Sequence, residues 1–115
     1  MKHLRTLDDL SADDVIAILN RADELKAEYK NGKRTPVLPG RLMSLLFETP
    51  SLRTRVSFEA AMTHLGGGSV FQSTGEAGLN GRESLPDVTR VLSGFSDVIV
   101  LRTFSQQLID DFAEH

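Results

Sequence analysis

The sequence contains no cysteine and no long apolar run among its 115 residues. The absence of cysteine excludes a disulfide framework, thiolate catalysis and a cysteine-ligated metal. A membrane-spanning helix is excluded as well, because it would need about 18 or more consecutive apolar residues. The first residues turn acidic at Asp8 and Asp9, where a signal peptide would need its apolar segment. We therefore expect a cytoplasmic protein.

Several common types of site are also missing. The two glycine-rich phosphate-binding patterns, GxxxxGKS/T and GxGxxG, do not occur. The histidines, His3, His64 and His115, are too scattered for the spacing of metal ligands. The formal net charge is −3, whereas a general nucleic-acid-binding protein usually has a basic excess. These features argue against a metal protein or a nucleic-acid binder, but they leave room for a local basic pocket.

Apolar residues alternate between helical spacing and short continuous runs, within a length that suits one modest domain. The predicted helices cover residues 11–30, 51–65, 84–95 and 105–115, and the predicted strands cover 41–48, 69–73 and 97–104. In the first helix one face is apolar and is expected to be buried: Val15, Ile18, Leu19, Ala22, Leu25 and Tyr29. The alternation predicts an α/β fold, an open parallel sheet with crossover helices on both faces, as part of a doubly wound domain.

The segment FETPSLRTRVSFE joins the first predicted strand to the second predicted helix. Ligands of open parallel sheets bind beyond the carboxyl ends of the strands. A helix that begins near Ser51 would present backbone N–H groups and the positive end of its dipole there, and both attract phosphate or carboxylate. Thr54 can add a second hydroxyl donor, and Arg53 or Arg55 can add a charged fork. The turn is therefore a candidate anion site.

A purely structural interpretation of this turn is the alternative. Ser51 would then be a simple N-cap, and Arg55 and Glu59 would form a surface pair of the i, i+4 type. Cations in the first turn of a helix oppose its dipole, however, so they are poor choices for stability alone. Arg102 directly follows another apolar run, again at the carboxyl end of a predicted strand. Two neighbouring strand ends would then direct cations at one crevice, which favours anion binding.

The same residues resemble a known family. SLRTR (51–55) is similar to the Ser-x-Arg-Thr-Arg signature of the carbamoyltransferases, and the resemblance extends over essentially the whole chain. The segment from Lys2 to Lys26 resembles the first helix of ornithine carbamoyltransferases, and the segment from Arg82 to Phe104 resembles the stretch that leads to their second arginine. Proline before the serine and leucine after it look more ornithine-type than aspartate-type.

The resemblance implies that residues 1–115 are most of a carbamoyl-phosphate-binding domain in a two-domain, usually trimeric enzyme. That enzyme transfers the carbamoyl group of carbamoyl phosphate to the δ-amine of L-ornithine and gives citrulline and phosphate, as part of arginine biosynthesis. It needs no metal or organic cofactor. The family's His-Pro-Cys-Gln-like segment and its amino-acid-binding domain are expected beyond His115. This chain alone should therefore not turn over ornithine.

By position, the resemblance implies a role for each residue of the candidate site. Ser51, Arg53, Thr54 and the backbone N–H of Leu52 would hold the phosphate. Arg102 would hold the phosphate and the carbonyl oxygen, and Arg53 and Thr54 would share the catalytic work with it. Arg55 would brace the turn, against Glu59.

The glycine-rich loop around Gly78 to Glu83 would reach into the site of a neighbouring subunit. Gly78 stands where ornithine-type enzymes often have glutamine, the loop has no lysine, and Arg82 would be its cation. Gln106 stands where many relatives have histidine.

Three other interpretations stay open from the sequence. The acceptor could be another amine, such as aspartate, putrescine or an N-acylated ornithine. The chain could instead be a phosphate-binding or regulatory module without catalysis. A purely structural oligomerisation module is the third alternative, and it would respond to no anion.

Overall fold

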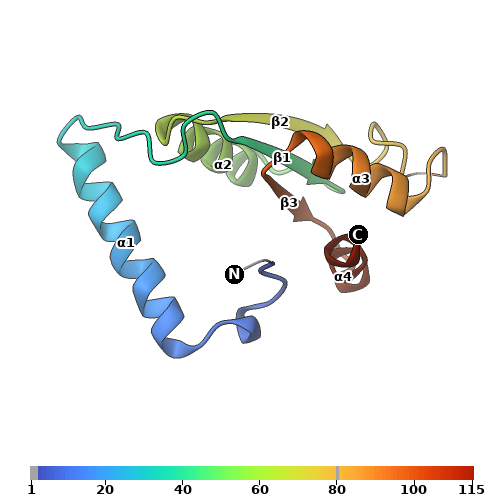
Figure 1. The fold of residues 1–115 in the computed structure, drawn as a ribbon, viewed down its shortest axis with the longest axis horizontal. Helices are drawn as coiled ribbons and strands as arrows, with labels where there is room; N and C mark the ends of the chain where they lie inside the picture. The colour runs from blue at the N-terminus through green and yellow to red at the C-terminus, as the bar shows by residue number, and fades with distance from the viewer. Residues whose placement is uncertain (1–2, 80) are drawn as a thin grey trace. The chain divides into compact units, whose positions relative to one another are not determined.

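The protein is described here by a computed structural model that covers residues 3–79 and 81–115. The chain divides into two compact units, residues 1–35 and 36–115. Its elements are a short 3-10 helix η1 (Leu7–Asp9), α1 (Ala12–Lys30), β1 (Leu42–Phe47), α2 (Leu52–His64), β2 (Gly68–Ser73), α3 (Leu85–Phe95), β3 (Val98–Arg102) and α4 (Gln106–Glu114) (Figure 1). Each helix and strand predicted from the sequence is present, and η1 was not predicted. Within the described residues, no helix is both long enough and apolar enough to cross a membrane.

Helix α1 begins with the capping box that its sequence predicts. The Ser11 hydroxyl accepts a hydrogen bond from the Asp14 N–H at 3.1 Å, and the Asp14 carboxylate accepts one from the Ser11 N–H at 3.0 Å. The backbone hydrogen bond from Ser11 is the main reason why the pKa of Asp14 is lowered from its ordinary value of 3.8. This box satisfies two N–H groups that would otherwise have no partner at the start of the helix.

Within the described part of its own unit, nothing covers the apolar face of α1, and the burial expected for that face stays a prediction. No residue of α1 is buried, and Leu19 in the middle of the face is 59% exposed. The described part of this unit contains no strand and only one other helix, the three-residue η1. A helix buries an apolar stripe only against another layer, and this unit supplies none.

Residues 36–115 contain a three-stranded parallel sheet in the order β2-β1-β3. The central strand β1 pairs with both neighbours, so that Phe47 lies opposite Ser73 on one side and opposite Arg102 on the other. Residues 43–47 of β1 are all buried. Burial on both faces explains why this strand reads as a continuous apolar run.

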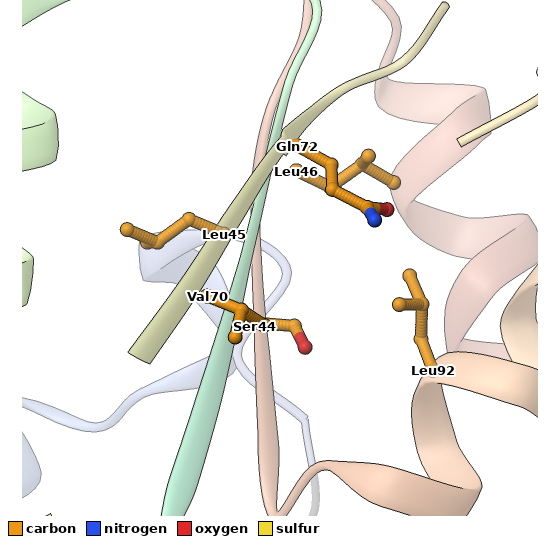
Figure 2. Close-up of a pocket in the computed structure, with 6 residues that line it drawn as sticks. All are labelled: Ser44, Leu45, Leu46, Val70, Gln72 and Leu92. Carbon is orange, nitrogen blue, oxygen red and sulfur yellow. The ribbon is translucent and has the colours of Figure 1, made fainter. Parts of the chain in front are cut away.

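The two faces of the sheet carry separate cores. On the face with α2, the buried residues are Met43, Leu45, Phe47 and Met62. On the face with α3 and α4, they are Leu46, Val88 and Phe112. Figure 2 shows this division, with Leu45 directed to one side of the sheet and Leu46 and Ser44 directed to the other, toward Leu92 of α3. The predicted α/β fold with helices on both faces is therefore confirmed.

The side chains drawn in Figure 2 line a cavity of about 40 Å³ between the sheet and α3. The Ser44 hydroxyl is hydrogen-bonded to Ser96, and the other lining residues are mostly apolar. Small-molecule sites usually measure about 300–1,000 Å³. This cavity is therefore a packing gap and not a substrate site.

Candidate functional site

The three strands end together at one edge of the sheet, called here the carboxyl edge. The Glu48 N–H, just after β1, donates to the Arg102 carbonyl at 2.8 Å. The Thr74 N–H, just after β2, donates to the Phe47 carbonyl at 3.1 Å. The segments that leave the strands therefore lie side by side, and the adjacency expected for the SLRTR turn and Arg102 is confirmed at the level of the strands.

Helix α2 starts from β1 without the side-chain cap that its serine could provide. Ser51 occupies the N-cap position, but its hydroxyl makes no cap hydrogen bond and donates instead to Thr54 Oγ1 at 2.9 Å. In α1 and α3, by contrast, the N-cap serine accepts from the helix, and the first turn contains aspartate. The first turn of α2 has no acidic residue. The positive end of its dipole therefore lacks the acceptor and the negative charge that usually complement a helix start.

Arg53 and Arg102 differ in their contacts from six other arginines of the chain. Four arginines pair with carboxylates: Arg21, Arg41, Arg55 and Arg90. Arg34 and Arg82 donate to backbone carbonyls. In the part of the chain that the structure describes, no carboxylate pairs with the guanidinium of Arg53 or Arg102, and both residues are exposed. Two charged forks are therefore available to an anion at neighbouring strand ends.

Arg55 contacts a carboxylate and an aromatic ring, although it shares one helical turn with Arg53. Its Nε donates to Glu59 Oε1 at 2.9 Å, as expected for a brace, and its Cζ lies 3.7 Å from the centre of the Phe71 ring. Phe71 in turn packs edge-on against Phe47, with 5.3 Å between the ring centres. Arg55 therefore ties the start of α2 to β2. The sequence did not mark Phe71, because this contact depends on strand pairing.

The loop between β2 and α3 is held mainly by its own residues. The Arg82 guanidinium donates to the carbonyls of Gly75 at 2.6 Å and Glu76 at 3.3 Å. Gly78 is buried and has a φ of +90°, and a Cβ there would lie 2.8 Å from a carboxylate oxygen of Glu83. The positive φ favours glycine at position 78, whereas the Glu83 carboxylate is the flexible end of a side chain and could move aside. The contact of Gly78 and Arg82 with a neighbouring subunit stays a prediction.

A cleft of about 330 Å³ also opens at the carboxyl edge. It is lined by Glu48, Thr74, Leu79, Gly81, Glu83, Leu85 and Leu108. This lining contains two carboxylates and none of the residues predicted to bind the anion. The cleft therefore suits phosphate poorly, and the candidate anion site is the open surface formed by residues 51–54 and Arg102. Among the residues that the structure describes, no group of three His, Cys, Asp or Glu side chains could hold a metal ion.

One charged residue at this edge was not singled out from the sequence. Glu48 Oε1 accepts hydrogen bonds from Thr103 Oγ1 at 2.5 Å and from the Phe104 N–H at 3.3 Å. The only signal in the sequence was its position directly after the buried strand β1. Its partners are 55 and 56 residues further along the chain, so the pairing could not be read from local pattern.

Comparison with known proteins assigns the chain to a family. A family model described as "Aspartate/ornithine carbamoyltransferase, carbamoyl-P binding domain" matches residues 2–115. The chain therefore belongs to the aspartate/ornithine carbamoyltransferase family, in the part described as its carbamoyl-phosphate-binding domain. The resemblance drawn from SLRTR is confirmed.

Individual relatives agree with this assignment. The chain is 43% identical to an ornithine carbamoyltransferase of Cupriavidus metallidurans, over 100% of this chain and 38% of that protein. It superposes on an ornithine carbamoyltransferase from Pyrococcus furiosus with a TM-score of 0.93 and 36% identity, over 98% of this chain and 36% of the other. An aspartate transcarbamoylase from Trypanosoma cruzi, in complex with carbamoyl aspartate and phosphate, gives a TM-score of 0.89 and 33% identity, over 98% and 35%. The chain thus spans little more than a third of these relatives.

Proposed function

We propose that residues 1–115 form most of a carbamoyl-phosphate-binding domain, and that they supply this site to an enzyme that carbamoylates the δ-amine of L-ornithine. The products are citrulline and phosphate. The observation that carries the proposal is the pair of guanidinium groups, Arg53 and Arg102, without a carboxylate partner among the described residues at adjoining strand ends. Arg53 itself lies in the first turn of α2, whose uncapped start supports the same anion.

The roles follow from the charge that the reaction develops. The neutral amine attacks the carbonyl carbon, and negative charge grows on the carbonyl oxygen. The C–O bond to phosphate then breaks with its electron pair leaving on phosphate, which takes up the proton that the amine nitrogen loses. Arg102 stabilises the carbonyl oxygen and the phosphate, and Arg53, Thr54, Ser51 and the N–H of Leu52 hold the phosphate. Donors that are already in place stabilise such charge without reorganising, and alignment of the reactants supplies much of the rest. No metal or organic cofactor takes part in this scheme.

Ornithine is proposed as the acceptor because the Cupriavidus metallidurans relative carries that name at 43% identity. Aspartate is the second candidate, because an aspartate transcarbamoylase superposes with a TM-score of 0.89. The chain covers only 38% of the first relative, so we propose that residues outside it choose the amine. The whole enzyme is expected to be a cytoplasmic homotrimer of arginine biosynthesis. Product analysis with both amines, on the enzyme purified from its source, distinguishes citrulline from carbamoyl aspartate.

Calorimetric titration of the chain with carbamoyl phosphate, and with inorganic phosphate for comparison, tests the proposed site. We expect wild type to bind and Arg53→Ala or Arg102→Ala to bind roughly ten- to a hundredfold more weakly, since each removes a charge-assisted hydrogen bond. Arg90→Ala is the matched control, because Arg90 is an exposed arginine on α3 that faces Asp87 at 3.7 Å. Equal affinity of wild type and Arg53→Ala, or no binding by a demonstrably folded chain, would refute the site.

A further inference from the structure

Glu48 occupies the point at which the two halves of the proposed anion site meet. It is the first residue after β1 and stands three residues before Ser51 in the sequence. Its backbone N–H donates to the carbonyl of Arg102 at 2.8 Å and so extends the pairing of β1 with β3 by one bond. The backbone of Glu48 is therefore fixed against the residue whose side chain is proposed to hold the carbonyl oxygen.

The Glu48 side chain binds the residues that follow Arg102. One carboxylate oxygen, Oε1, accepts from Thr103 Oγ1 at 2.5 Å and from the Phe104 N–H at 3.3 Å. Thr103 Oγ1 accepts in turn from the N–H of Ser105, the N-cap residue of α4, at 3.1 Å. A single residue thus contacts three successive positions, 102 to 104, and reaches the start of α4 through Thr103.

Packing does not hold this segment in the same way. The Phe104 side chain is 82% exposed, so it contributes little burial that could fix the chain after β3. Hydrogen bonds to a charged acceptor are stronger than those between neutral groups. The carboxylate of Glu48 is therefore the main restraint that the structure shows on residues 103 and 104, beyond the strand pairing itself.

A negative charge at this position is costly for the proposed function. The anion would bind at the same edge of the sheet, and like charges repel. If fold stability were the only requirement, a neutral acceptor would serve without this cost. The presence of a carboxylate is consistent with a need for strong acceptors at this point.

We infer that Glu48 is a positioning residue, which holds residues 102–104 so that the Arg102 guanidinium faces the same anion as Arg53. The inference rests on the proposed function, and it adds a residue that touches neither the phosphate nor the carbonyl oxygen. Glu48 acts through the hydrogen bonds that its carboxylate accepts, which its charge strengthens, and not through a direct effect of that charge on the anion.

Titration of the full chain with carbamoyl phosphate separates these two modes of action. Glu48→Gln keeps an oxygen that can accept from Thr103 and Phe104, and it removes the charge. We expect Glu48→Gln, whose neutral oxygen accepts weaker hydrogen bonds, to bind about threefold more weakly than wild type. We expect Glu48→Ala to bind roughly tenfold more weakly, because loss of hydrogen bonds of this kind changes equilibria by about that factor. If charge were the main effect, both variants would bind more tightly than wild type, and the inference would be wrong.

A double-mutant cycle with Arg102→Ala shows whether the effect passes through Arg102. We expect Glu48→Ala to cause no further loss of affinity in the Arg102→Ala background. A loss of the same size in both backgrounds, or a lower melting temperature with unchanged affinity, would mean that Glu48 only supports the fold. Thr103→Val removes the hydroxyl donor and is expected to weaken binding several-fold by the same route. It keeps the test decisive if Glu48→Ala does not fold.

The failure of this inference differs from the failure of the proposed function. Binding by wild type that is lost in Arg53→Ala supports the anion site whatever Glu48→Ala does. If Glu48→Ala then binds as well as wild type, only the positioning role is wrong. If the folded wild-type chain binds no carbamoyl phosphate, the site and the positioning role are both overturned.

Discussion

At the residue scale, the site depends on the different contacts that neighbouring arginines make. Arg53 and Arg55 lie two positions apart in the first turn of α2, and Arg102 ends β3. Arg55 is engaged by Glu59 and Phe71, whereas Arg53 and Arg102 pair with no carboxylate among the described residues. One arginine thus fixes the helix, and the other two are proposed to bind the anion.

Arg55→Ala is therefore expected to affect stability more than binding. The substitution removes an i, i+4 ion pair and a stacking contact with Phe71, and together these should lower the free energy of unfolding by about 1 kcal/mol. Urea unfolding of the two proteins measures the difference. A variant as stable as wild type that binds carbamoyl phosphate as weakly as Arg53→Ala would show instead that Arg55 contacts the anion.

The sequence alone could propose the turn but could not choose between its arginines. Serine, threonine and two arginines at a strand-to-helix junction indicate anion binding by their chemistry, and this much is local. The separate use of Arg55 depends on Phe71, 16 residues away in the sequence, which pairing of β1 with β2 brings near. The hydrogen bonds of Glu48 to Thr103 and Phe104 depend on pairing of β1 with β3 in the same way.

At the scale of the elements, the opposite edge of the sheet shows how β1 and β3 are kept in register. Asp97 precedes β3, and its carboxylate accepts from the Leu42 N–H at 2.8 Å and from Arg41 Nη1 at 3.2 Å. Its own N–H donates to the Leu42 carbonyl at 2.8 Å. The hydrogen bond from Leu42 is the main cause of a lowered pKa for Asp97, and Arg41 adds to it. Asp97 and Glu48 thus join the same two strands at their two ends.

The lowered pKa of Asp97 predicts a pH-dependent contribution to stability. A carboxyl whose pKa is lower in the folded protein stabilises it at pH values above the unfolded pKa and loses this effect as the pH falls through the folded value. Wild type should therefore be more stable than Asp97→Asn at neutral pH. The difference should shrink as the pH falls below the ordinary value of 3.8.

Urea unfolding of both proteins at neutral pH and at a series of pH values below 3.8 measures this change. A difference that stays constant over the whole series would show that Asp97 acts through its shape and hydrogen bonds, and not through its ionisation.

The strands and helices themselves were predictable, because each has a strong local pattern. The apolar run at residues 43–47 indicated a strand buried on both faces, and Ser11 with Asp14 indicated a capped helix. Burial of the α1 stripe was not predictable from the same pattern. Helical spacing shows that one face is apolar, but another layer must cover it, and the described residues of that unit provide none.

At the scale of the whole molecule, the fold gathers residues from distant parts of the sequence at one edge of the sheet. The order β2-β1-β3 places the SLRTR turn after the central strand and Arg102 after its neighbour. The family assignment and the superposition on carbamoyltransferases over 98% of the chain agree with this arrangement. The chain covers 38% of the Cupriavidus metallidurans relative, so the choice of amine is proposed to lie in residues outside it.

Amide chemical shifts of the isotope-labelled chain, recorded by NMR during titration with carbamoyl phosphate, locate the anion directly. We expect the largest shifts at the N–H groups of Leu52, Arg53 and Thr54, and at the side-chain Nε–H of Arg102. These should saturate together with one dissociation constant, because one anion contacts both strand ends. Shifts confined to the cleft around Leu79, Leu85 and Leu108, or shifts at the turn without any at Arg102, would contradict a shared site.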